Sequence, residues 1–114
     1  MVTGKSRTII IGLDGVPFGM LKDFTATGVM PHTAKLLSQA VFRKMRSSIP
    51  EVSSVAWSSI ITGKNPGEHG IFGFTDLHTY SYELRFPRFS DLKVPPFWDV
   101  WDGPSVIINV PATY

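Results

Sequence analysis

The 114-residue sequence contains no cysteine, which excludes a disulfide framework and a metal site built from thiolates. It has no apolar stretch near the ~20 residues of a membrane span, and its first apolar run is too short for the core of a signal peptide. Net charge is only +2, too small by itself to indicate a nucleic-acid partner. We therefore expect a cytoplasmic protein with no membrane partner.

What is present indicates a globular chain. Hydrophobic residues make up 43% and charged residues 18%, proportions that permit a packed core. The sequence shows no repeat, low-complexity segment or linker, so we expect one domain over residues 1–114. Nucleic-acid binding is a minor alternative, because a solvated strand face explains its basic residues equally well. Those residues are Arg43, Lys44, Arg46, Arg85 and Arg88.

Three segments have the character of strands. Residues 8–13 form a continuous apolar run rich in β-branched side chains, which favours a strand buried on both faces of a parallel sheet. Residues 41–46 and 105–110 are two further candidates. Between them, the sequence favours helices and one long irregular excursion. This order predicts an α/β fold with a largely parallel sheet flanked by helices.

Helix signals are clearest in the first half of the chain. A helix is predicted over residues 18–27 with Gly28 as its stop, and a second one begins at Pro31. Apolar residues at helical spacing continue this second pattern to Val41 and predict a core-facing side. A third helix follows Ser53 or Ser54 and ends before Gly63.

Later elements are weaker. Residues 71–92 predict an irregular excursion with strand signals around residues 80–86, and a short helix is expected with Pro96 near its start. We expect the large apolar side chains of the last two helices to lie in the core. They are Trp57, Ile60 and Ile61 in one helix and Phe97, Trp98 and Trp101 in the other.

Asp14 directly follows the first predicted strand. Open α/β sheets place their chemistry at the carboxyl ends of the strands, so Asp14 is a candidate metal ligand. Asp-Gly is also common turn chemistry, and an aspartate that binds only its own backbone is an equal alternative.

Ser53 and Ser54 stand where the third helix begins. One alternative is helix capping, and the other is that a serine hydroxyl acts as a nucleophile. No serine-histidine-aspartate arrangement and no G-x-S-x-G elbow is present to activate a serine. A divalent metal would serve instead, held in part by a hard carboxylate ligand such as Asp14. For Glu68 and His69 we expect structural roles, as an acid that follows a helix and as a loop histidine, because neither has metal-ligand spacing to a second residue.

Several segments together resemble the type I phosphodiesterase/nucleotide pyrophosphatase family of the alkaline phosphatase superfamily. They are G-L-D-G at 12–15, M-P at 30–31, P-x-x-S-x-x-A-W-x-x-x-x-T-G-x-x-P-x-x-H-G at 50–70 and I-I-N-V-P-A-T-Y at 107–114. The resemblance extends over nearly the whole chain. The C/S-x-P-x-R signature of the related sulfatases is missing, which disfavours a formylglycine mechanism.

The resemblance implies a reaction and two site residues. Asp14 matches the family's first metal-binding aspartate, and Ser53 matches the nucleophile, which also contacts the metal. The implied reaction is hydrolysis of a phosphodiester or nucleotide-type substrate through a phosphorylated enzyme. Two divalent ions, usually zinc, stabilise the attacking and leaving oxygens from positions roughly 3.5–4 Å apart.

The sequence also departs from the family pattern. Family members run to several hundred residues, and their remaining metal-binding aspartates and histidines come after the region matched here. We therefore expect an alkaline-phosphatase-like fold in truncated form, with little or no turnover, and a chain that by itself could lack bound metal.

A non-enzymatic module is the alternative function. Part of a larger α/β domain would leave an open sheet edge and apolar faces, which self-association would cover. This predicts a homo-oligomer or a complex with a complementary fragment. Phe72, Phe74, Trp98 and Trp101 are candidates for such a surface, although burial in the core explains each of them as well.

Overall fold

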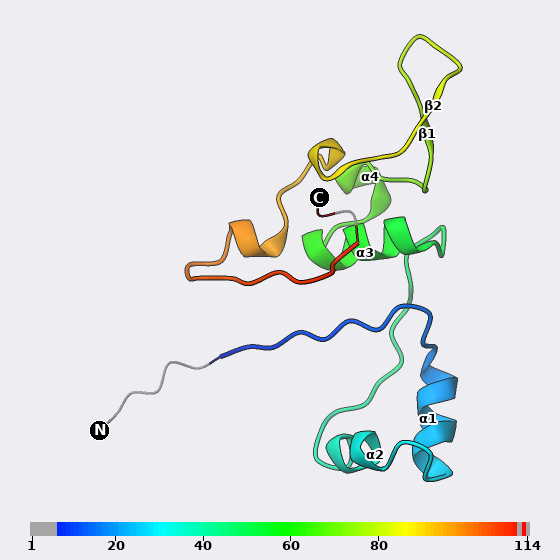
Figure 1. Cartoon of the computed structure of the whole chain (residues 1–114), viewed down its shortest axis with the longest axis vertical. Coiled ribbons are helices and arrows are strands. Elements are labelled where there is room, and N and C mark those ends of the chain that lie inside the picture. Colours follow the sequence, from blue (N-terminus) through cyan, green and yellow to red (C-terminus); the bar gives the residue numbers. More distant parts are fainter. Residues whose placement is uncertain (1–6, 112, 114) are drawn as a thin grey trace. The chain divides into compact units, whose positions relative to one another are not determined.

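The computed structural model describes residues 7–111 and 113 (Figure 1). Its contacts divide the chain into two compact units, Met1–Met45 and Arg46–Tyr114. Each unit is described by itself below. No helix in the described part of the chain is both long and apolar enough to cross a membrane.

The first unit contains two helices, α1 (Phe18–Ala26) and α2 (Pro31–Leu37). The start and stop signals read from the sequence are confirmed. Gly28 has a φ of 76°, a left-handed conformation that glycine adopts without steric cost and that ends α1. Pro31 occupies the first turn of α2, where the absence of its N–H costs no hydrogen bond.

The prediction that helical packing continues to Val41 is wrong. Helix α2 ends at Leu37, and Val41 is 80% exposed. The N–H groups of Gln39 and Ala40 donate to carbonyls three residues earlier, at 3.1 and 3.4 Å. These tighter turns end the helical pattern before Val41.

The second unit is built on α3 (Ser53–Thr62) and α4 (Pro66–His69). Gly63 follows α3 with a φ of 65° and donates its N–H to the Ser59 carbonyl, so it ends the helix as the sequence predicts. Asn65 then caps α4 through a capping box with Glu68.

The buried face of α3 agrees with the predicted one only at Ile61. Val55, Ser58 and Ile61 are buried, at the three-residue spacing of one helix face, whereas Ile60 is 47% exposed and Trp57 half-buried. A serine can be buried here because its hydroxyl donates to the carbonyl one turn earlier. The prediction is confirmed for Ile61 and wrong for Ile60, because apolar character alone does not identify the buried face.

The irregular excursion after α4 is confirmed and contains a small hairpin. Strands β1 (Asp76–Leu77) and β2 (Leu84–Arg85) pair antiparallel, with Asp76 opposite Arg85. Two short 3-10 helices follow, η1 (Phe89–Asp91) and η2 (Phe97–Asp99). The Arg85 guanidinium contacts both Asp76 and Asp91 at 2.8 Å, and so ties the hairpin to η1.

The aromatic residues around η2 are less buried than predicted. Phe97 is 40% and Trp101 is 62% exposed, while Trp98 is half-buried and lies edge-on to Phe97 at a ring distance of 5.2 Å. The reason is the length of the element: η2 is a single turn, so Trp101 lies beyond it in a loop.

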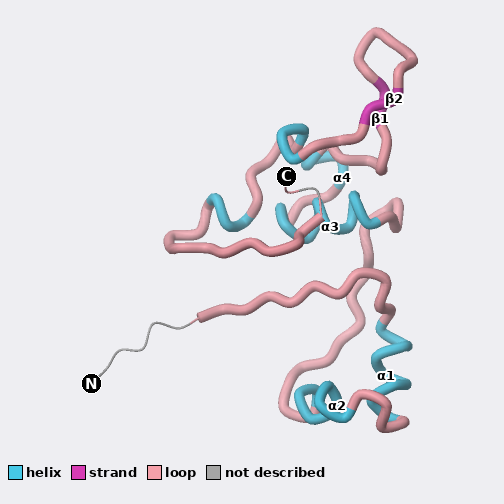
Figure 2. The backbone as a smooth tube through the Cα atoms, viewed as in Figure 1, coloured by secondary structure: helices cyan, strands magenta, loops and turns pink. Residues whose placement is uncertain are grey.

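Residues 8–13, 41–46 and 105–110 are loops rather than strands in the described structure (Figure 2). A strand is stabilised by ladder hydrogen bonds to a neighbouring strand, and none of these segments belongs to a sheet here. The largely parallel sheet depends on how such segments pair with one another, and it stays a prediction. The single domain over residues 1–114 stays a prediction as well.

Candidate functional site

Ser53 is the first residue of α3, and the position before it, the N-cap, is Val52. Neither serine occupies the N-cap position, and no side-chain cap hydrogen bond is made there. The Val52 carbonyl instead accepts the N–H groups of Val55 and Ala56 at 3.1 and 2.9 Å. The capping alternative for the two serines is therefore wrong at the N-cap itself.

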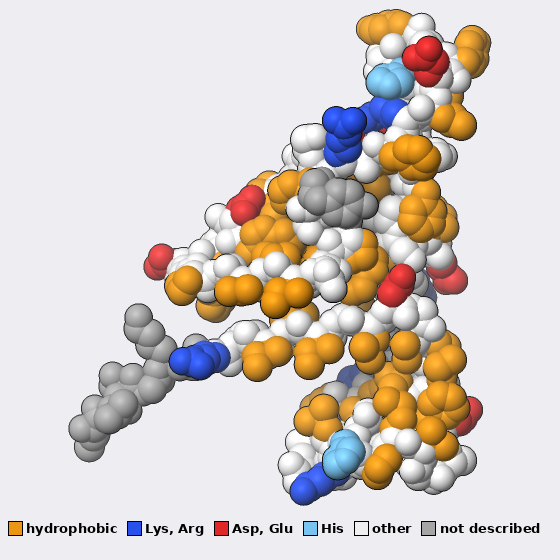
Figure 3. Space-filling view, viewed as in Figure 1, with side chains coloured by type: hydrophobic (Ala, Val, Ile, Leu, Met, Phe, Trp, Pro, Cys, Tyr) orange, Lys and Arg blue, Asp and Glu red, His pale blue; other side chains and the backbone are white. Residues whose placement is uncertain are grey.

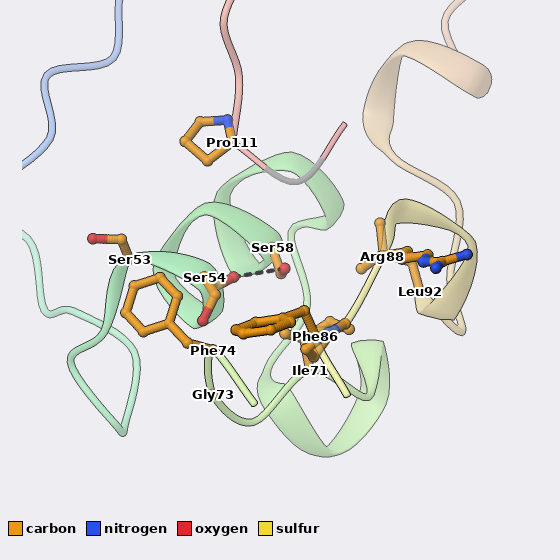
Figure 4. A pocket seen from close by; sticks show the side chains of 11 residues that line it. Ser53, Ser54, Ser58, Ile71, Gly73, Phe74, Phe86, Arg88, Leu92 and Pro111 are labelled. Carbon is orange, nitrogen blue, oxygen red and sulfur yellow. Dashed lines mark hydrogen bonds between the residues drawn. The ribbon is translucent and has the colours of Figure 1, made fainter. Parts of the chain in front are cut away.

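Ser54 has a different environment. Its hydroxyl oxygen is buried and has no hydrogen-bond partner within the described part of the chain. Its backbone carbonyl accepts the Ser58 hydroxyl at 2.7 Å, the contact drawn in Figure 4. The two adjacent serines thus differ: Ser53 is half-exposed at the helix start, and Ser54 places its hydroxyl inward.

A pocket of about 160 Å³ lies beside these serines (Figure 4). Ser58 and Ile71, both buried, form part of its lining, and the phenyl rings of Phe74 and Phe86 form another part. The remaining lining residues are Ser53, Ser54, Gly73, Pro87, Arg88, Leu92 and Pro111.

Asp14 lies in a turn with Gly15, immediately after the apolar run 8–13. Gly15 has a φ of 67°, so the turn uses the conformational freedom of glycine. The Asp14 side chain is exposed, which leaves its carboxylate accessible to solvent. Asp14 belongs to the first unit and Ser53 to the second. We therefore give the contact of both residues with one metal ion as a proposal.

His69 is the residue whose environment the sequence did not indicate. The prediction of a loop histidine is wrong, because His69 is the last residue of α4 and is fully buried. Its Nδ1 accepts the Ile71 N–H at 3.1 Å, which assigns the proton of the neutral ring to Nε2. Nε2 lies 3.0 Å from Ser59 Oγ and donates to it. Burial lowers the pKa of His69, and the nearby Glu68 carboxylate opposes that shift more weakly.

Glu68 has the structural role that its position predicts. Its carboxylate accepts the Asn65 N–H and lies 3.2 Å from Lys64 Nζ. The hydrogen bond from Lys64 and the one from the Asn65 backbone lower the pKa of Glu68. This carboxylate stabilises the start of α4 and is engaged in doing so.

Comparison with known proteins shows the family of this chain. The family model for type I phosphodiesterase / nucleotide pyrophosphatase matches residues 8–113. The chain belongs to this family. No curated protein and no solved structure gives a significant match. The match includes Asp14, Ser53 and the apolar segments 8–13 and 105–110; residues 112 and 114 of the 107–114 motif lie outside the described structure.

The phosphodiesterase family is a hydrolase family and is generally metal-dependent. Asp14 and Ser53 offer hard oxygen donors, the type that a divalent cation accepts. They are two donors, and a tetrahedral zinc site requires four. Among residues 7–111 and 113, no cluster of three or more His, Cys, Asp or Glu side chains could hold a metal ion. The donor atoms of the two residues are of the type that binds a divalent metal ion. Other ligands would have to complete the coordination of that ion.

Proposed function

We propose that this family member hydrolyses a phosphodiester or pyrophosphate bond with Ser53 as the nucleophile, and that the 114-residue chain by itself gives little or no turnover. The observation that carries the proposal is the place of Ser53 within the family match: it is the first residue of α3, directly after a non-capping Val52. A hydroxyl at this point lies at the helix end where backbone N–H groups gather. Zinc as the metal, and a cytoplasmic location, are parts of the same proposal.

Local electrostatics favour an anionic substrate at this point. Helix α3 has ten residues, and its amino-terminal end carries the partial positive charge of the helix dipole. Phosphoryl groups bind at such helix starts because the N–H groups there have no partner within the helix. The acidic first-turn residues that would repel a phosphoryl group are absent from α3.

The reaction has two steps. Ser53 Oγ attacks phosphorus, forming an oxygen–phosphorus bond while the bond to the leaving oxygen breaks, and the hydroxyl proton passes to solvent. Water then attacks the same phosphorus, the bond from phosphorus to Ser53 Oγ breaks, and the serine oxygen takes up a proton from the attacking water. Asp14 and Ser53 would each supply one ligand to a divalent ion, whose contribution when bound is to stabilise the deprotonated serine oxygen and the leaving oxygen.

A hydrolysis assay tests this function. With bis(4-nitrophenyl) phosphate and added Zn²⁺, Ser53→Ala should abolish release of 4-nitrophenol above the uncatalysed rate. Ser48→Ala is the matched control, because the Ser48 hydroxyl donates to the nearby Pro50 carbonyl. A rate above the uncatalysed one that is equal in the wild type and in Ser53→Ala would refute the role of Ser53.

Self-association is a second candidate function, favoured by exposed apolar segments. In the first unit, Ile9 and Ile11 are 82% and 79% exposed; in the second, Val106 and Ile108 are 84% and 75% exposed. Figure 3 shows many hydrophobic side chains on the visible surface. We propose that a second copy or a complementary fragment covers such segments. A monodisperse monomer by light scattering at high concentration would contradict this.

A further inference from the structure

The residues that line the pocket beside Ser53 favour one chemical kind of ligand. Its buried part includes Ser58 and Ile71, which are 2% and 4% exposed. The rings of Phe74 and Phe86 line the same pocket and remain 58% and 74% exposed. Two largely exposed phenyl rings within one pocket are an apolar surface available for contact with a ligand.

Charge in the lining is sparse. Among the described residues that line the pocket, Arg88 is the only charged one, and no carboxylate is present. A cationic group would therefore gain no ion pair and would lose hydration in this pocket. A neutral apolar group meets favourable surface on Phe74, Phe86 and Leu92.

The volume of the pocket is sufficient for one ring. The pocket holds about 160 Å³. A cavity of roughly 150 Å³ lined by apolar side chains binds one benzene molecule, so a single ring fits into this space. Aromatic rings in such surroundings pack against phenyl faces or edges, as Phe74 and Phe86 would allow.

The position of Ser53 relates the pocket to the proposed reaction. Ser53 lies at one side of the lining residues in Figure 4, and its hydroxyl points away from Phe86. A phosphoryl centre bonded to this oxygen would lie outside the pocket, with one of its ester substituents reaching in. We propose that the pocket takes a small, uncharged, ring-sized ester group of the substrate, with Phe74 and Phe86 determining this specificity. The inference rests on Ser53 as the nucleophile only for the identity of the ligand as a phosphoryl ester.

Binding of unreactive probes tests the pocket separately from catalysis. Phenylphosphonate and methylphosphonate carry the same headgroup and differ in the ring, and neither is hydrolysed. Calorimetric titration should show phenylphosphonate binding about tenfold more tightly, as expected from burying roughly 60 Å² of ring surface. Phe74→Ala and Phe86→Ala should each reduce this ratio, and Ser53→Ala should leave it in place.

Phe72→Ala is the matched control, since Phe72 is 60% exposed and is not among the lining residues. It should keep the full preference for phenylphosphonate. Equal affinity for the two probes, no detectable binding of phenylphosphonate, or a ratio unchanged in both Phe74→Ala and Phe86→Ala would overturn the inference. If the ratio behaves as expected while Ser53→Ala still hydrolyses ester substrates, the pocket stands and the proposed nucleophile fails.

Discussion

His69 Nε2 lies 3.0 Å from Ser59 Oγ, and this contact joins the end of α4 to the middle of α3. The other ring nitrogen is engaged by the Ile71 N–H, so both polar atoms of a fully buried imidazole have partners. Helix α3 begins with Ser53, and the histidine therefore helps to fix the helix that carries the proposed nucleophile.

Acid should destabilise the second unit through His69. Burial places the pKa of His69 below its ordinary value of 6.5 in the folded chain. As the pH falls through 6.5, the unfolded state takes up a proton that the folded state does not, so the free energy of unfolding decreases. The decrease levels off once the pH lies below the folded pKa. Urea unfolding between pH 8 and pH 5, followed by tryptophan fluorescence, measures the effect.

A histidine variant separates this effect from general acid sensitivity. Tryptophan fluorescence reports on the second unit because all three tryptophans, residues 57, 98 and 101, belong to it. His78→Gln, at an exposed position in the same unit, should keep the decrease in stability between pH 7 and pH 5.5. His69→Gln should remove it. A pH profile that is identical in all three proteins would contradict the assignment.

Ser59→Ala should lower the free energy of unfolding by about 1–3 kcal/mol, because it leaves the buried His69 Nε2–H without an acceptor. Ser48→Ala is the control, since its hydroxyl bond to the Pro50 carbonyl is exposed. That variant should change stability by less than about 0.5 kcal/mol. Equal urea midpoints for the two variants would show that the histidine contact contributes nothing.

Gly63→Ala should destabilise the second unit by about 1–2 kcal/mol, since a side chain at a φ of 65° crowds the following carbonyl. Among the described residues other than its two chain neighbours, none has a heavy atom within 4 Å of the position that the added Cβ would take, so the local backbone conformation accounts for the cost. Asparagine tolerates this conformation better, and Gly63→Asn should cost less than Gly63→Ala. Thermal unfolding of both variants gives the order, and the reverse order would refute this explanation.

Asp14→Asn should weaken the dependence of hydrolysis on Zn²⁺, because an amide oxygen is a poorer ligand than a carboxylate. A titration of activity against Zn²⁺ should shift to at least tenfold higher concentrations, on the order of the losses seen when metal-site groups are altered. Asp23→Asn, in α1, is the matched control and should leave the curve unchanged. An unchanged curve for Asp14→Asn would remove Asp14 from the metal site.

Local signals in the sequence predicted local structure well. Gly28, Pro31 and Gly63 mark helix ends because each acts through its own backbone geometry, which does not depend on distant residues. The environment of His69 was not predictable in this way. Its burial depends on contacts with Ser59, ten residues earlier, and on the Ile71 N–H.

The polar residues of α3 show a second limit. Ser58 is buried because its hydroxyl bonds to the preceding turn, a possibility that apolar periodicity ignores. The candidate site was found through Ser53, whose family motif is a run of neighbouring residues. The sequence did not predict the pocket. Phe74, Phe86 and Pro111 come together through turns of the chain, and the sequence around each residue does not indicate that they share a pocket.

The most direct test of the central claim is to identify the residue that becomes covalently phosphorylated. The protein is mixed with bis(4-nitrophenyl) phosphate and Zn²⁺, quenched in acid before the second step is complete, and digested for mass spectrometry. We predict a phosphoryl ester on Ser53, absent in Ser53→Ala and retained in Ser48→Ala. A phosphoryl group on Ser54, its persistence in Ser53→Ala, or an unmodified Ser53 would contradict it.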